Sequence, residues 1–156
     1  MRVAVAMDHG GFPAREVVLQ AVREAGHEPV FLGAFADEPT DDYPDYAKKL
    51  GEAVQKGQAE RGILVCGSGV GACIAANKIQ GIYASVAHDD YSAAQGVQHD
   101  QMNVLCLGAR VVGPEVIRTL ISSFLAAVPS SEPRHLRRVG KIHQIEAEDL
   151  LNGGKK

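Results

Sequence analysis

The feature of this sequence best suited to chemistry is a cysteine at the start of a glycine-rich turn. The apolar run 62–65 leads directly into Cys66, and glycine then occupies positions 67, 69 and 71. Such glycines let backbone N–H groups crowd around a ligand, and a helix beginning near Ala72 would add the positive end of its dipole. An anion or a developing oxyanion is the expected guest. Although most cysteines are simply small buried side chains, this position favours a reactive thiolate.

Other polar residues could reach the same site or bind an anion. Asp8 and His9 follow the first apolar run, where they either face a ligand crevice or serve as a helix cap with an exposed imidazole. His99 precedes another apolar run, at an edge where a titrating side chain could meet a ligand. Arg134 and Arg138 lie four residues apart, so they share a helix face that could clamp a phosphate. A basic helix start is more often simply solvated, but it opposes the helix dipole, which favours a bound anion here.

Short apolar runs alternate with amphipathic segments and would position these residues. This alternation predicts an α/β fold, a Rossmann-like doubly wound sheet of five parallel strands with flanking helices. We expect one domain over residues 1–156, with a core of about 1–128 and a C-terminal helical arm of about 129–152. The expected strands are residues 3–7, 28–32, 63–66, 82–87 and 104–107. The expected helices follow Pro13, Pro44, Ala72, Tyr91, Pro114 and Pro133, the last running to about residue 151.

Composition is that of an ordinary globular protein, with 46% hydrophobic and 22% charged residues over 156 positions. A net charge of -3 gives no general argument for binding nucleic acid or a membrane surface. The three cysteines, Cys66, Cys73 and Cys106, form no CxxC pair, so disulfide and zinc sites are both poorly supported. Cys73 and Cys106 are expected to be buried. No signal peptide and no membrane-spanning apolar run is evident, and we expect a cytoplasmic protein.

The glycine turn also matches a dinucleotide-binding pattern. Residues 67–72 fit G-x-G-x-x-G/A, and Asp89 and Asp90 follow the next expected strand, near the distance of a ribose-binding acid. That pattern belongs after the first strand of a nucleotide-binding fold, whereas here it follows the third. The cysteine ahead of it also favours chemistry over cofactor binding. Nucleotide binding therefore remains the weaker interpretation.

Taken together, the motifs resemble those of type B ribose-5-phosphate isomerases, a family that includes galactose-6-phosphate and allose-6-phosphate isomerases. The similarity runs from Met1 to about Ile145, and its combination of motifs is very specific although each is weak alone. The motifs are Asp8-His9-Gly10-Gly11, Asp42-Tyr43-Pro44, Cys66-Gly67-Ser68-Gly69-Val70-Gly71, Ala75-Ala76-Asn77-Lys78, Tyr91-Ser92-Ala93, Asn103-Val104-Leu105 and Leu107-Gly108-Ala109-Arg110-Val111-Val112-Gly113.

The resemblance implies an aldose–ketose isomerase that works through a cis-enediolate without metal or cofactor. Cys66 would be the base that moves the proton between C1 and C2, while Ser68 and the loop from Gly67 through Gly69 and Val70 to Gly71 would bind the enediolate oxygen. His99, with Asp8 nearby, would open the furanose ring. The phosphate would lie against basic residues, namely His9, Arg110, Arg134 and Arg138.

The resemblance also implies a homodimer or tetramer with sites between subunits. Some of the arginines should then come from the partner chain, and the final helix should reach a subunit interface instead of packing only on its own domain. One branch of the family lacks the cysteine and uses a glutamate six residues later. This chain has Cys66 and carries Ala72 at that later position, so it belongs to the cysteine type.

One departure from the family pattern concerns the substrate. Relatives commonly have His-Asn-Asp, whereas this chain has His99-Asp100-Gln101, preceded by an altered run at 95–98. An ionised aspartate cannot donate a hydrogen bond as the asparagine does, and it adds negative charge near an anionic substrate. Ribose 5-phosphate is the first expectation. A six-carbon sugar phosphate and a non-catalytic phosphosugar- or nucleotide-binding module are the alternatives.

Overall fold

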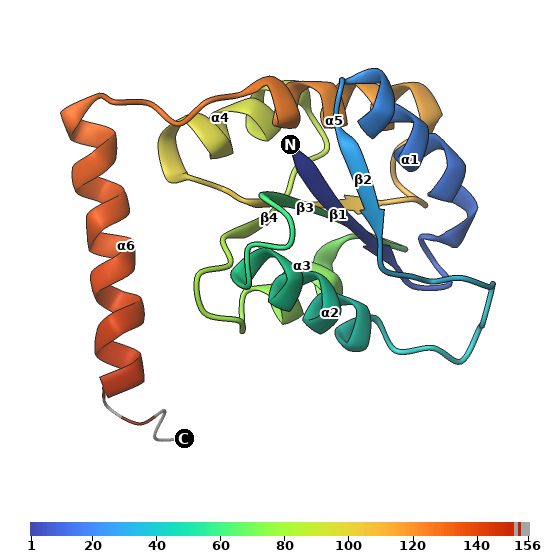
Figure 1. Ribbon diagram of the computed structural model, residues 1–156, viewed down its shortest axis with the longest axis horizontal. Helices are drawn as coiled ribbons and strands as arrows, with labels where there is room; N and C mark the ends of the chain where they lie inside the picture. The colour runs from blue at the N-terminus through green and yellow to red at the C-terminus, as the bar shows by residue number, and fades with distance from the viewer. Residues whose placement is uncertain (152, 154–156) are drawn as a thin grey trace.

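A five-stranded parallel sheet lies between two layers of helices in the computed structural model, which describes residues 1–151 and 153 (Figure 1). The sheet order is β2-β1-β3-β5-β4, and each neighbouring pair is parallel. All strands therefore end at one edge, where ligand sites of open α/β sheets form. The strands are β1 (Arg2–Met7), β2 (Glu28–Phe31), β3 (Arg61–Cys66), β4 (Ala84–Val86) and β5 (Val104–Gly108).

Helices cover both faces of the sheet, as a doubly wound fold requires. The helices are η1 (Phe12–Ala14), α1 (Arg15–Glu24), α2 (Tyr43–Gln55), α3 (Val70–Ala76), α4 (Asp90–Asp100), α5 (Pro114–Ala126) and α6 (Pro133–Leu151). Along β1, Val3, Val5 and Met7 pack with α1, α4 and α5, while Ala4 and Ala6 pack with α2 and α3. Alternate residues of one strand thus enter two separate cores, which explains why the strand reads as an unbroken apolar run. The predicted α/β class and five parallel strands are confirmed.

The prediction was least accurate around β4. The strand expected at residues 82–87 is limited to Ala84–Val86, because Tyr83 bonds outside the strand pairing: its amide donates to Asn103 Oδ1 at 2.8 Å. The helix expected to start at Tyr91 begins one residue earlier and runs to Asp100. Asp89 caps this helix, since its Oδ1 accepts a 2.7 Å hydrogen bond from the Ser92 amide.

The turn after β1 packs directly against β3. Asp8 is buried, and its Oδ1 accepts a 2.9 Å hydrogen bond from the Gly11 amide, so the carboxylate caps this turn. A Cβ on Gly11 would overlap the carbonyl of Val65, and one on Gly10 would lie 2.8 Å from the Gly67 amide nitrogen. The absence of side chains at both glycines therefore lets the first turn lie beside the cysteine loop.

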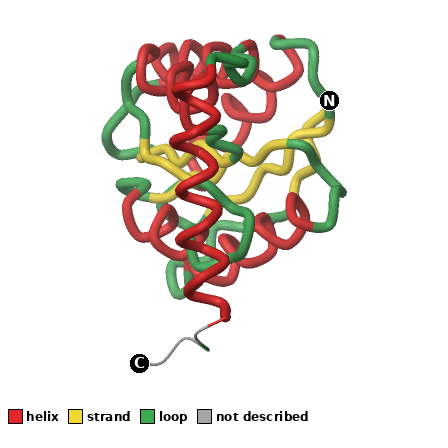
Figure 2. Tube along the Cα trace, turned by 90° about the vertical axis from the view of Figure 1, so that its left-hand side faces the viewer, coloured by secondary structure: helices red, strands yellow, loops and turns green. Residues whose placement is uncertain are grey.

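Helix α6 has the predicted bounds and stands at one side of the molecule, where it crosses the edges of the sheet and of both helix layers (Figures 1 and 2). It contacts its own domain: Glu146 accepts hydrogen bonds from the Tyr83 hydroxyl at 2.9 Å and the Gly81 amide at 2.8 Å, and His143 stacks on Tyr83. Within the described part of the chain, no helix combines the length and apolar character needed to cross a membrane.

We predict that Gly11→Ala destabilises the fold markedly. The new Cβ would meet backbone atoms of Val65, which cannot rotate away, so the free energy of unfolding should fall by about 3 kcal/mol. Gly140→Ala is the matched control, because a Cβ there meets open space within α6 and should raise helix stability by about 0.5–1 kcal/mol. Urea denaturation of both variants measures the difference, and equal midpoints would contradict this packing.

Candidate active site

An open pocket of about 370 Å³ lies at the carboxyl edge of the sheet. Its walls come from the ends of β1 and β3, the start of α2 and the segment after β5. The lining residues are Asp8, His9, Gly10, Tyr43, Cys66, Gly67, Ser68, Gly71, Arg110 and Val111. The predicted crevice that joins the first and third strand ends is therefore present within a single chain.

Cys66 ends β3 and is only 6% exposed. Its Sγ accepts a 3.0 Å hydrogen bond from the amide of Gly69, an arrangement that stabilises a thiolate. Gly69 has a φ of 84°, and a Cβ there would lie 3.1 Å from the backbone of Leu107. Only glycine adopts this conformation without strain, so the turn that points an amide at the sulfur depends on Gly69.

Ser68 and Gly71 complete this wall. The Val70 amide lies 3.3 Å from Ser68 Oγ, which can accept its hydrogen bond and stays at the pocket surface. The first amides of α3 have no partner within the helix and can serve an oxygen of a ligand. Gly71 lies against the ring of Tyr43. A Cβ on Gly71 would come within 2.8 Å of that ring, so a larger residue would not fit without a shift.

His9, Asp8 and Arg110 also line the pocket. His9 Nδ1 lies 2.7 Å from Asp41 Oδ1, and the same oxygen accepts a 3.1 Å hydrogen bond from the His9 amide. The Arg110 side chain extends over Gly67, whose Cβ would be 3.5 Å from it. A guanidinium and an imidazole thus lie beside the cysteine loop in the same pocket, which suits an anionic substrate.

The hydrogen bond to Asp41 raises the pKa of His9, with smaller contributions from the charges of Asp8 and Asp41. Burial alone would raise the pKa of Asp41, but hydrogen bonds from the His9 ring and amide outweigh burial and lower it. Both shifts favour an imidazolium–carboxylate pair. Protonated His9 therefore persists to higher pH than an isolated histidine would.

The structure places four predicted site residues away from this pocket, and two others, Gly69 and Val70, belong to the cysteine loop without lining the pocket. His99 and Asp100 form the last turn of α4, whose end leads into the start of β5 and thus lies toward the opposite edge of the sheet from Cys66. Arg134 and Arg138 are exposed on α6. One chain therefore does not bring these four residues to the cysteine, and their predicted roles require a second chain.

His99 has a defined environment of its own. The Gln95 amide nitrogen lies 2.8 Å from His99 Nδ1 and 3.5 Å from Asp100 Oδ2. The ring of His99 packs edge-on against His135, with 3.9 Å between centroids. Burial and the neighbouring His99 lower the pKa of His135. If the Gln95 amide donates to Nδ1, Nε2 of neutral His99 carries the hydrogen and is available as a hydrogen-bond donor.

The other two cysteines lie away from the pocket lining. Cys106 is fully buried in β5, as predicted, and Cys73 is half-buried on α3. Hydrogen bonding with Cys106 lowers the pKa of Cys73 to about 7, while Cys73 and burial raise that of Cys106. Cys73 is thus an acidic thiol that the pocket does not use.

Asp8, His9 and Asp41 also bring three possible metal-ligating atoms within 4.8 Å of one another. The hydrogen bonds described above already engage His9 Nδ1, Asp41 Oδ1 and one Asp8 oxygen. The group is therefore a self-paired network, and the prediction of a reaction without metal or cofactor stays a prediction.

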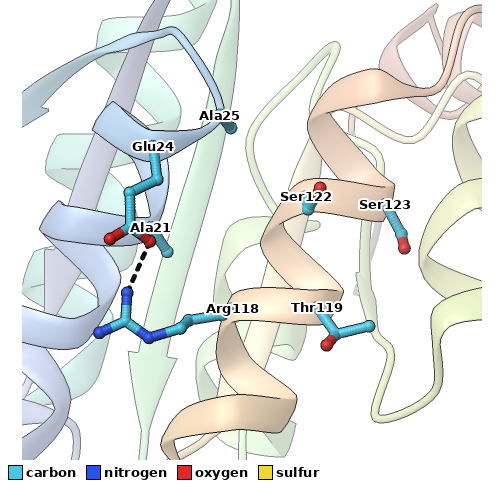
Figure 3. A pocket seen from close by; sticks show the side chains of 7 residues that line it. All are labelled: Ala21, Glu24, Ala25, Arg118, Thr119, Ser122 and Ser123. Atoms are coloured by element: carbon cyan, nitrogen blue, oxygen red, sulfur yellow. Dashed lines mark hydrogen bonds and ion pairs between the residues drawn. The ribbon is translucent and has the colours of Figure 1, made fainter.

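A second pocket lies between α1 and α5 (Figure 3). Its charged residues neutralise each other, since Arg118 forms a 2.7 Å ion pair with Glu24. The other lining side chains are small: Ala21, Ala25, Thr119, Ser122 and Ser123. The hydroxyl groups of this pocket have no free base or cation beside them in the lining, because Arg118 and Glu24 are engaged with each other, and the pocket is a poor candidate for the active site.

Sequence reasoning missed some of the residues around the active-site pocket. Tyr43 and Val111 belong to motifs quoted above, but their residue types and spacing do not predict a role for either. Asp41 lies in an acidic segment, 33–43, whose irregular spacing does not show which carboxylate turns inward. His88 is tied to the end of β5, because its Nε2 accepts a 3.0 Å hydrogen bond from the Gly108 amide.

Comparison with known proteins identifies what this arrangement resembles. The family model described as Ribose/Galactose Isomerase matches residues 3–142. The chain is 41% identical to ribose-5-phosphate isomerase B of Escherichia coli, over 93% of this chain and 96% of the relative. It is 39% identical to D-erythrulose-4-phosphate isomerase 2 of Mycolicibacterium smegmatis, over 80% of this chain and 84% of the relative.

Solved structures agree with this similarity. Type B ribose 5-phosphate isomerase of Trypanosoma brucei superposes with a TM-score of 0.89 at 47% identity, covering 92% of this chain and 97% of that one. Ribose-5-phosphate isomerase B of Mycoplasma genitalium, solved with bound ribulose 5-phosphate, gives 0.87 at 36% identity, covering 94% and 97%. The similarity thus extends over nearly the whole fold.

Proposed function

Because the chain belongs to the ribose/galactose isomerase family and is a sugar-phosphate isomerase, we propose that it interconverts ribose 5-phosphate and ribulose 5-phosphate. The observation that carries the proposal is the buried Cys66 sulfur, held by the Gly69 amide in a pocket that His9 and Arg110 also line. That pairing provides a base next to an anion-binding surface. A non-catalytic nucleotide- or phosphosugar-binding module is set aside, since the relatives are isomerases.

In the proposed reaction, the Cys66 thiolate removes the proton from C2 of the open-chain aldose. The C2–H electrons form the C1–C2 double bond, and the negative charge moves to O1 of a cis-enediolate. The O2 proton then transfers to O1, the ketone forms at C2, and the Cys66 thiol returns a proton to C1. No metal or cofactor is needed for this sequence, because the electron pair stays within the substrate.

Ser68 and the amides of the glycine loop would stabilise the enediolate. The Ser68 hydroxyl can donate to the developing oxyanion while it accepts from Val70, and the first amides of α3 near Gly71 point to the same region. The cis geometry places both enediolate oxygens on one side, within reach of a single loop. Gly69 remains committed to the sulfur.

The phosphate and the ring-opening group would complete the site from a second chain. His9 and Arg110 line the pocket, whereas Arg134 and Arg138 are exposed on α6. We therefore propose a homodimer or tetramer in which α6 of one subunit brings its arginines to the pocket of another. His99 of that second subunit would open the furanose ring, assisted by Asp8.

Exposed apolar residues support a subunit contact through α6. Leu136 is 48% exposed, Ile145 67% and Leu150 54%, all on the same helix. Large apolar side chains gathered on one exposed helix are typical of an interface. A cytoplasmic location is part of the same proposal, in keeping with three cysteines that are all unpaired.

The relatives favour one further substrate class. D-erythrulose-4-phosphate isomerases share this sequence pattern, so a four-carbon sugar phosphate is the second candidate beside the six-carbon alternatives. We propose that Asp100 influences which sugar phosphate is preferred. The asparagine that relatives commonly have at this position can donate a hydrogen bond to a sugar hydroxyl, whereas a carboxylate cannot.

Cys66→Ala should abolish the chemical step while keeping the fold. A general base contributes about 10²–10⁴-fold, so kcat for ribose 5-phosphate should fall by about that factor with little change in KM. Cys73→Ala is the matched control, because that thiol is outside the pocket lining. Full activity of Cys66→Ala, or equal losses in both variants, would rule out the proposed base.

Mixing two inactive variants tests the shared site. Cys66→Ala and His99→Ala should each be inactive alone, yet co-expressed chains should recover about a quarter of wild-type activity, because half of random dimers contain one intact site of two. Two wild-type preparations diluted equally provide the reference. Absence of recovery in dimers shown by mass spectrometry to be mixed would place His99 and Cys66 in the same chain's site.

Asp100→Asn should shift substrate preference. Restoring a hydrogen-bond donor and removing a negative charge should raise kcat/KM for ribose 5-phosphate about tenfold relative to four- and six-carbon sugar phosphates. A panel of sugar phosphates assayed with both proteins measures the ratios. Unchanged ratios would show that Asp100 has no part in choosing the sugar.

A further inference from the structure

Asp41 makes two hydrogen bonds to the same pocket residue. One carboxylate oxygen, Oδ1, lies 2.7 Å from Nδ1 of the His9 ring and 3.1 Å from the His9 backbone nitrogen. The Asp41 side chain is only 8% exposed, although it comes from a loop 32 positions further along the chain. This buried carboxylate therefore fixes both the backbone and the ring orientation of His9.

The contact determines which ring nitrogen faces the pocket. A carboxylate only accepts hydrogen bonds, so Nδ1 of His9 must carry the hydrogen directed at Asp41. Nε2 is left for the pocket, where it donates a hydrogen bond only when the ring is an imidazolium. A phosphate oxygen only accepts unless it is protonated, so binding of a phosphate dianion by His9 depends on that charged form.

We propose that Asp41 is a positioning residue that holds His9 as an imidazolium, aimed through Nε2 at the phosphate of the substrate. This proposal rests on the proposed function for the identity of the substrate, but the anion site itself consists of residues of one chain. Neither the family resemblance nor the recognised motifs drew attention to Asp41.

The other charged groups around His9 act in opposed directions. Asp8, at the end of β1, favours the protonated ring, whereas Arg110, from the segment after β5, disfavours it. Cys66 lines the same pocket, so its thiolate form would also favour the imidazolium. Asp41 makes the largest contribution to the raised pKa of His9.

Behind the carboxylate, α2 supplies Tyr46 and Asp45. Burial raises the pKa of Tyr46, the adjacent Asp41 carboxylate raises it further as a hydrogen-bond acceptor, and the charges of Asp41, Asp8 and Asp45 add to that effect, so the phenol stays neutral. Asp41 Oδ2 is buried, and no hydrogen-bond partner for it is found among the described residues. The negative charge of Asp41 is therefore balanced mainly by His9, which is the arrangement that an imidazolium requires.

Asp41→Asn tests the proposal with little change of shape. The amide keeps an oxygen that can accept from both His9 nitrogens, but it removes the charge. Asp37→Asn is the matched control, with the same charge change at an exposed position of the same loop. The probe is inorganic phosphate at pH 7.5, followed through the ring Cε1–H resonance of His9, which is assigned by its loss in His9→Asn.

We expect Asp41→Asn to raise the dissociation constant for phosphate about tenfold and Asp37→Asn to change it less than about twofold. The His9 resonance of the free Asp41→Asn protein should titrate at lower pH than in the wild type. With ribose 5-phosphate as substrate, KM should begin to rise with pH earlier in Asp41→Asn, while kcat stays within about twofold.

An unchanged His9 titration together with unchanged phosphate affinity would overturn the proposal, as would a loss confined to kcat. If Asp41→Asn does not fold, by circular dichroism, Asp41→Ser provides the same loss of charge with a smaller side chain. The phosphate titration does not depend on turnover. A wild-type chain without isomerase activity would therefore contradict the proposed function. The measurements of phosphate affinity would still test the positioning role of Asp41.

Discussion

The hydrogen bond from the Gly69 amide to the Cys66 sulfur is the contact on which the proposed chemistry depends. It requires the left-handed backbone of Gly69, and the glycines at 10 and 11 let the turn after β1 lie beside this loop. The buried strands β1 and β3 fix both turns at one edge of the sheet. The Cys66 sulfur and the cationic side chains of the pocket are thereby brought together by backbone packing, with few side chains involved.

Two groups of residues around the pocket differ in their electrostatics: the loop after Cys66, and the pair His9 and Arg110. The loop after Cys66 offers mainly backbone amides, which suits a charge that appears only during the reaction. His9 and Arg110 carry full charges, which suits a ligand group that is charged throughout the reaction, such as a phosphate. In our account, one chain supplies a base and part of a phosphate site, and α6 of a second chain supplies the rest. On this proposal, the site of a single chain is incomplete, and two chains must associate to complete it.

Much of this organisation could be predicted from the sequence. Buried parallel strands produce unbroken apolar runs, prolines mark where α2, α5 and α6 begin, and the spacing of glycines after Cys66 marks the anion loop. The misplaced features have physical reasons. Residues 82 and 83 have strand-like composition, but their amides donate to the Ile79 carbonyl and the Asn103 side chain instead of to a neighbouring strand. The weak amphipathicity of α4 made its extent to Asp100 hard to predict. Asp41 could not be selected among neighbouring acids, because its inward orientation depends on contacts with a distant histidine.

The central claim is that a protein thiol carries the proton between two carbons of the sugar. Isomerisation of ribose 5-phosphate in deuterium oxide, followed by nuclear magnetic resonance of the ribulose 5-phosphate formed, tests it directly. A proton held by Cys66 exchanges with solvent during the lifetime of the enediolate, so the account predicts deuterium at C1 of the product. Complete retention of the original C2 hydrogen at C1, with no solvent deuterium, would contradict this prediction, because direct hydride transfer from C2 to C1 would then account for the product equally well.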